Sequence, residues 1–194
     1  MRKLWLLSAV VLLLFAGVAA GNNPQAQQSN ASTAQAAATQ PERASAVPMQ
    51  TFTSSDGRFS ILFPGTPQQT SQVVNLKNGD STTIYQFSAE ADSGNTSYIV
   101  MYNDYSAAVV ADSPQALLER TRDGAVAGKT LLTDVVIDLN GVPGRAYTAV
   151  DPDGYNYEVH EYLAGTRFYQ LIITTSKGFT ATQAGAFMNS FRIL

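Results

Sequence analysis

Four residues whose side chains suit ligand binding lie close together in the second half of the chain: Arg145, Tyr147, Glu158 and His160. An arginine and a histidine can hold a carboxylate between them, while a glutamate or a tyrosine orients it. His160 is the only histidine in the sequence. These four are therefore the candidate ligand-binding residues.

A predicted hairpin would bring the four candidates to one face of a sheet. If Asp151-Pro152-Asp153-Gly154 forms the turn, Val150 lies opposite Tyr155. All four candidates then share a face, because side chains alternate along a strand. They also fit an ordinary ladder of charged cross-strand pairs, which are common on antiparallel sheets. The sequence leaves both interpretations open.

No catalytic set is predicted. A serine triad would have to use His160, yet no Gly-x-Ser-x-Gly motif occurs, and Ser190 falls in a predicted helix beside core residues. The aspartates of residues 151–154 could suggest calcium, but Tyr155 and Tyr157 stand where further oxygen ligands are needed. A turn is the better interpretation. The expectation is a protein that is not an enzyme, with no catalytic or metal-binding residue and no cofactor.

Composition excludes several classes of function. The chain has 12 Lys+Arg against 15 Asp+Glu, and no basic cluster follows residue 3, so no nucleic-acid partner is expected. The sequence has no cysteine. Disulfides, thiolate metal sites, cysteine nucleophiles and a lipid-modified cysteine are therefore excluded.

Residues 1–20 have the pattern of a signal peptide. Arg2 and Lys3 precede an apolar run from Leu4 to Ala16, which ends in small residues through Ala20. This pattern predicts a protein that is secreted or periplasmic after cleavage. The alternative is that the leader is retained as an anchor, which would be the only contact with a membrane.

Residues 21–50 are almost all Asn, Gln, Ala, Ser, Thr and Pro. Such a segment buries too little apolar surface to offset its ordering entropy, so it is predicted to be a flexible low-complexity linker. An assembly arm is the alternative.

Residues 51–194 form the predicted domain, in which short apolar or alternating runs are separated by Gly, Pro, Asp and Asn. The predicted strands cover residues 59–63, 72–76, 82–88, 98–102, 131–138, 145–150, 155–163 and 167–175. Ser113 and Pro114 open a predicted helix that Gly128 closes. Thr180 and Gln183 are spaced as a capping box for a second helix with one buried face, formed by Ala184, Phe187, Met188 and Phe191.

Several segments of this domain together are similar to a known family. They are SDGRFS (55–60), FPGTP (63–67), LNGVPGRAYTAV (139–150), TRFYQLIIT (166–174) and FMNSFRIL (187–194). In combination they resemble small secreted bacterial domains related to PsbP, an extrinsic protein of photosystem II whose fold is shared with Mog-type Ran-binding proteins. The resemblance implies an α+β fold, an α-β-α sandwich with a central antiparallel sheet flanked by helices. It carries over no site residue, and a fold alone does not assign a function.

Two functions are predicted. The first is an exported, non-catalytic binding or accessory module with a protein partner in the cell envelope, and the many tyrosines of the domain would suit such an interface. The alternative is a small-ligand-binding protein or hydrolase that uses the face with Arg145, Glu158 and His160.

Overall fold

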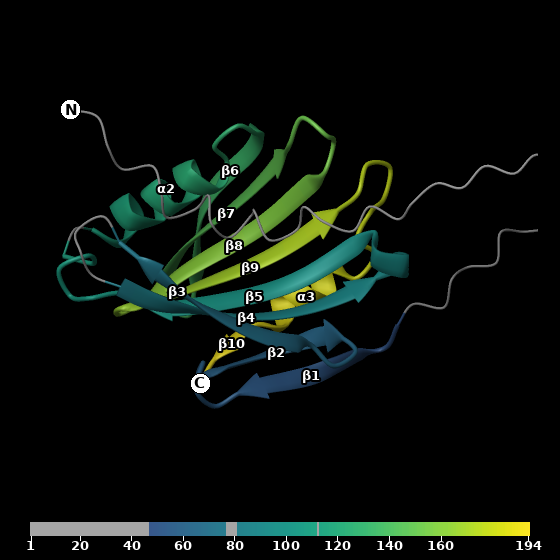
Figure 1. Cartoon of the computed structure of the whole chain (residues 1–194). Helices are drawn as coiled ribbons and strands as arrows, with labels where there is room; N and C mark the ends of the chain where they lie inside the picture. Colours follow the sequence, from purple (N-terminus) through teal and green to yellow (C-terminus); the bar gives the residue numbers. More distant parts are fainter. Residues whose placement is uncertain (1–46, 77–80, 112) are drawn as a thin grey trace, which may run out of the picture.

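The computed structural model describes residues 47–76, 81–111 and 113–194. The predicted signal peptide and most of the predicted linker lie outside these residues. Within them the chain forms two antiparallel sheets and two α-helices (Figure 1). None of the described helices is long and apolar enough to cross a bilayer.

The large sheet has seven strands. In order across the sheet they are β3 (Gln68–Asn75), β4 (Ser81–Ala91), β5 (Thr96–Asp104), β9 (Arg167–Thr175), β8 (Asn156–Ala164), β7 (Val142–Val150) and β6 (Thr130–Leu139). A short 3-10 turn, η2 (Asp92–Gly94), joins β4 to β5. The small sheet consists of β1 (Met49–Ser54), β2 (Phe59–Pro64) and β10 (Arg192–Ile193), with β2 in the middle.

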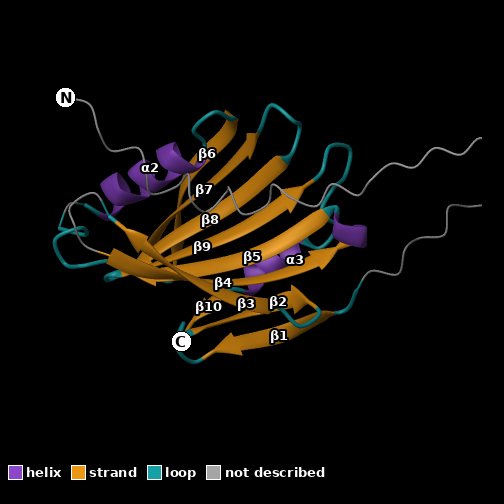
Figure 2. Ribbon diagram, in the orientation of Figure 1, coloured by secondary structure: helices purple, strands orange, loops and turns teal. Residues whose placement is uncertain are grey.

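The predicted α-β-α sandwich is wrong. One face of the large sheet is covered in part by α2 (Pro114–Ala125), which contacts β7 and β8. The other face is covered by the small sheet together with α3 (Ala184–Ser190), as Figure 2 shows. The difference arises because both ends of the described chain pair with β2 as strands. A second sheet therefore occupies the layer where helices were expected.

The core between the two sheets is largely aromatic. Phe59, Ile61 and Phe63 of β2 are fully buried against the large sheet, as their spacing of two residues requires. Phe187 and Met188 of α3 close this core, so the predicted apolar face of the second helix is confirmed. Side chains also alternate between the two faces of β9. Its two apolar faces belong to different clusters, with Tyr169, Leu171 and Ile173 in the core between the sheets and Phe168 and Ile172 on the α2 face.

The start of the fold differs from the predicted boundary. β1 begins at Met49, inside the segment predicted as linker, and pairs with β2 from Met49↔Pro64 to Ser54↔Phe59. The predicted capping box also does not form. Gln183 precedes α3 without a side-chain cap, and its Nε2 donates instead to the Val47 carbonyl at 3.0 Å. This hydrogen bond ties the beginning of β1 to the beginning of α3.

The predicted helix at Ser113 is confirmed. The Ser113 hydroxyl accepts a hydrogen bond from the Ala116 N–H at 3.2 Å, and Pro114 occupies the first turn. The helix ends at Ala125, and Gly128 adopts a φ of +79° in the turn that follows. α2 is thereby held across the large sheet, and it forms one wall of the site described next.

Candidate functional site

The structure divides the four predicted site residues between the two faces of the large sheet. In the observed register, Arg145 is the cross-strand partner of Glu161. Arg145 and Tyr147 therefore lie on the face that α2 covers, and Glu158 and His160 lie on the opposite face. The predicted register is wrong by one residue, and the four side chains cannot contact one ligand together.

The loop between β7 and β8 explains this shift. The Asp151 N–H donates to the Tyr155 carbonyl at 3.0 Å, so the closing pair is Asp151 with Tyr155 and the loop has one residue fewer than predicted. Gly154 supplies a φ of +89° at the last loop position, as a three-residue hairpin loop requires. A shift of one residue moves every side chain of the partner strand to the other face.

Arg145 is committed to an ion-pair network. Its guanidinium forms a bidentate pair with Asp134 of β6, at 2.6 and 2.7 Å, and lies 3.4 Å from Glu119 of α2. Asp134 also accepts from Arg122 of α2. Burial acts to raise the pKa of Asp134, but the hydrogen bond from Arg145 and the two positive charges lower it overall. This network pins α2 to the edge of the large sheet.

Glu158 and His160 are half-buried on the far face. Burial raises the pKa of Glu158 and lowers that of His160. His160 Nδ1 lies 3.4 Å from the Tyr162 hydroxyl. The described residues contain no group of three or more histidine or acidic side chains that could hold a metal ion.

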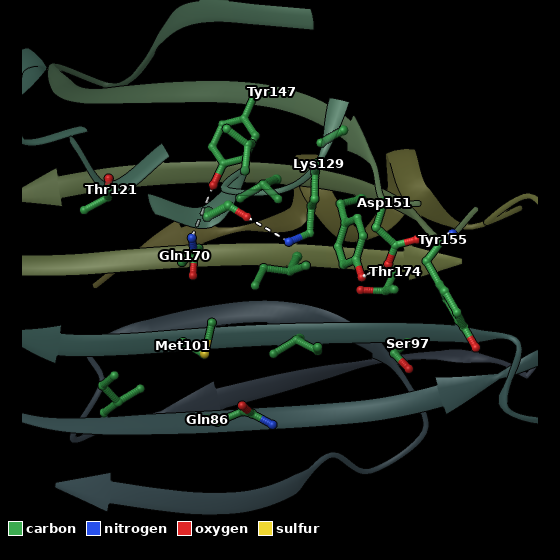
Figure 3. Close-up of a pocket in the computed structure, with 18 of the residues that line it drawn as sticks. Gln86, Ser97, Met101, Thr121, Lys129, Tyr147, Asp151, Tyr155, Gln170 and Thr174 are labelled. Atoms are coloured by element: carbon green, nitrogen blue, oxygen red, sulfur yellow. Dashed lines mark hydrogen bonds between the residues drawn. The ribbon is translucent and has the colours of Figure 1, made fainter. Parts of the chain in front are cut away.

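A cavity of about 530 Å³ lies between α2 and the large sheet, hereafter the α2 cavity (Figure 3). Its apolar lining includes Ile84, Ile99, Met101, Ala125, Val159 and Ile172. It follows the strands, and from Ser97 to Asn103 along β5 it extends roughly 20 Å at about 3.3 Å per residue. Its volume lies in the range of small-molecule sites. The cavity is therefore suited to an elongated, mainly apolar molecule.

One end of the α2 cavity is polar, and the exposed Tyr155 marks it. There Lys129 places its ammonium 5.1 Å from the centre of the Tyr157 ring and donates to the Ala125 carbonyl at 3.1 Å. Burial lowers the pKa of Lys129, an effect that Asp151 partly offsets. Asp151 itself accepts from the Tyr157 hydroxyl at 2.9 Å. A ligand that projects from this end would meet a positively charged group, Lys129, and a negatively charged group, Asp151.

A buried carboxyl group lies behind the middle of the cavity wall. Glu161 is fully buried and accepts hydrogen bonds from Thr121 of α2 at 2.7 Å, Tyr147 of β7 at 2.8 Å and Gln170 of β9 at 2.8 Å. All three donors line the cavity. Burial raises the pKa of Glu161 to about 7 against the lowering effect of these hydrogen bonds. Glu161 thus joins three elements of the cavity wall at one point.

Comparison with known proteins gives a likeness of fold only. No family model and no curated protein matches the sequence. The structure is similar to cyanobacterial PsbP. The solution structure of that protein, from Synechocystis sp. PCC 6803, matches 76% of this chain and 94% of its own, with 12% identity and a TM-score of 0.49. The resemblance predicted from sequence thus recurs among solved structures, at a similarity that assigns neither family nor function.

Two further solved structures are more distant. A Pseudomonas aeruginosa protein of unknown function, PA94, described as a putative regulator, has 15% identity over 66% of this chain and 83% of its own, with a TM-score of 0.38. A protein from Bacteroides thetaiotaomicron VPI-5482 has 12% identity over 74% of this chain and 48% of its own, with a TM-score of 0.37. The site is therefore interpreted from its own residues.

Sequence reasoning identified one residue of this site and missed the rest. Tyr147 was a predicted site residue and lines the α2 cavity. Glu161 was missed, although the corrected register places it opposite Arg145. The signal that could have found it is its position on the strand face of Tyr157, Val159 and Leu163, which is otherwise apolar. A carboxyl group on such a face must be hydrogen-bonded when it is buried.

Proposed function

We propose that this chain is a non-catalytic binding module that holds a small, elongated, mainly apolar molecule in the α2 cavity. One observation carries the proposal, namely a cavity of about 530 Å³ whose floor along the strands is mainly apolar and includes a few hydrogen-bonding side chains. An apolar molecule that fills it would leave water, with a gain of about 0.8 kcal/mol for each buried CH₂ group. A few placed polar groups would then fix its orientation.

The state of the polar groups favours binding over catalysis. His160 lies on the opposite face of the sheet from the cavity. Glu161 is enclosed by three donors, and Lys129 already donates to a main-chain carbonyl. Their contacts support a role in shaping the cavity and orienting a bound molecule rather than in proton transfer to a substrate. The proposal therefore contains no chemical step.

The experiment that tests the proposal is a titration with N-phenyl-1-naphthylamine, an uncharged fluorophore whose emission rises in apolar surroundings. We expect saturable binding with one molecule per chain, and competition by N-octylacetamide. A linear, unsaturable increase, or a stoichiometry well above one, would show adsorption to exposed surface instead and would contradict the proposal.

The exposed edge of the large sheet favours a second candidate function, the docking of an extended segment of an envelope protein. β6 is an edge strand, and Leu132, Val135 and Val136 on it are more than half exposed. An edge strand offers unpaired N–H and C=O groups to a further strand. A partner retained from envelope extract by the chain should be lost with Val136→Lys, and equal retention by both proteins would exclude this surface.

Both candidates would operate outside the cytoplasm. This part of the proposal rests on the leader pattern of residues 1–20, with its basic start, apolar run and small residues.

A further inference from the structure

Two side-chain amides, Asn103 and Gln170, lie beside each other in the α2 cavity on adjacent strands. Gln170 of β9 is the cross-strand partner of Met101 on β5, and Asn103 follows Met101 by two positions on the same face. Asn103 and Gln170 are thus diagonal neighbours, about 7–8 Å apart at the backbone. A group bound over Met101 would lie between them.

The buried carboxyl group of Glu161 fixes the orientation of Gln170. Gln170 Nε2 donates to Glu161 Oε1 at 2.8 Å and lies 3.4 Å from the Tyr147 hydroxyl. Both contacts use the N–H side of the amide, so the carbonyl oxygen is left for the cavity. Figure 3 shows this oxygen on the side of Gln170 that faces Met101. Gln170 therefore presents an acceptor to a ligand.

Asn103 presents the complementary donor. Its side chain is 5% exposed, and Nδ2 has no hydrogen-bond partner in the described structure. The Asn103 side chain also interacts with the Tyr105 hydroxyl, whose pKa it lowers against the raising effect of burial. A buried N–H group without a partner destabilises the structure, because it has lost its hydrogen bonds to water. A ligand oxygen at this position would remove that destabilisation.

We propose that the ligand of the α2 cavity carries a secondary amide on an apolar chain, and that Asn103 and Gln170 recognise this amide. The ligand carbonyl accepts from Asn103 Nδ2, and the ligand N–H donates to Gln170 Oε1. The two bonds of a trans amide point in opposite directions, which matches a donor and an acceptor on either side of one group. The apolar chain lies along Ile99 and Ile172. This inference rests on the proposed function and names the class of its ligand.

The test compares N-octylacetamide with octyl acetate by isothermal titration calorimetry on the full chain. The two molecules have the same chain and the same carbonyl, and only the amide has an N–H group. We expect the amide to bind about fivefold more tightly, as one hydrogen bond worth roughly 1 kcal/mol predicts. Equal affinities would overturn the inference and leave the proposed function standing, whereas no binding of either molecule would contradict both.

Three variants assign the preference to the two residues. Gln170→Met removes the acceptor, so the preference for the amide should disappear while the affinity for the ester is kept. Asn103→Leu removes the donor to the carbonyl, so both molecules should bind several-fold more weakly. Gln86→Met makes the same chemical change in the cavity, on the other side of Met101, and should keep the preference.

Circular dichroism and thermal unfolding would establish that each variant is folded. Retention of the fivefold preference by a folded Gln170→Met variant would contradict the assignment of the acceptor. Unchanged affinity of a folded Asn103→Leu variant for both molecules would contradict the assignment of the donor.

Discussion

Replacing Ile172 by Trp is expected to abolish binding to the α2 cavity, with a loss of at least about 100-fold in affinity. Ile172 lies on the cavity floor, where it packs with Ile99, Met101 and Val159. An indole at this position would occupy the volume that the ligand needs. Because one hundredfold corresponds to about 2.7 kcal/mol, the loss would be well outside the error of a fluorescence titration with N-phenyl-1-naphthylamine.

The fold should survive this change. An extra ring normally costs 1–3 kcal/mol in a filled core, but here the adjacent space is empty. Val73→Trp is the matched control, since Val73 lies on β3 and is 65% exposed. It adds the same ring to the protein without reaching the cavity, so it should bind the probe as the unmodified chain does. Full affinity in a folded Ile172→Trp variant would mean that the probe binds elsewhere.

The second large effect concerns the dependence of stability on pH. The native pKa of Glu161 is about 7, whereas an exposed glutamate has a pKa near 4.5. Below pH 4.5 both states hold the proton and the free energy of unfolding is unaffected. Between pH 4.5 and 7 only the native state holds it, so stability falls as the pH rises. Above pH 7 the loss is complete, on the order of 3 kcal/mol at about 1.4 kcal/mol per unit of pKa.

Urea unfolding of the native chain and of Glu161→Gln between pH 4.5 and 8 measures this effect. The variant cannot ionise at this position, so the difference between the two curves should change by roughly 3 kcal/mol across the interval. His160 acts in the opposite direction, because burial lowers its pKa and stability is then lost as the pH falls. It is present in both proteins, so its contribution cancels in the difference. Parallel curves would show that Glu161 does not titrate as described.

Alternation and turn chemistry predicted the strands well, and they could not predict how the layers pack. Phe59, Ile61 and Phe63 identify β2 because large apolar side chains recur there at every second position. β1 was missed because Met49–Ser54 has little apolar character, and it forms a strand through its pairing with β2. Local residue propensity carries no information about this long-range pairing. Because of the pairing, the protein consists of two packed sheets instead of the predicted α-β-α sandwich.

The prediction of the candidate site residues depended on the length of the loop between β7 and β8. The segment Asp151–Gly154 was correctly predicted as a turn, but its sequence fits loops of more than one length. The residue count of the loop decides which face carries Glu158 and His160 and which carries Glu161. A turn motif is a local property, whereas the register it sets determines every contact along two strands.

The amide-recognising pair could not have been found by motif. Asn103 and Gln170 are 67 positions apart in the sequence, and each is an ordinary polar residue in a strand. They become neighbours only because β5 pairs with β9. Their chemical roles as donor and acceptor depend in turn on Glu161, on a third strand. Such a site is a property of the assembled sheet.

The most direct test of the α2 cavity as the binding site is a methyl NMR titration of the full chain, labelled at isoleucine and methionine methyl groups, with N-octylacetamide. We expect saturable shifts at Ile99, Met101 and Ile172, which line the cavity, and none at Ile61 and Ile173, which are buried between the two sheets. Saturable shifts at Ile61 and Ile173, with Ile99, Met101 and Ile172 unchanged, would contradict the account.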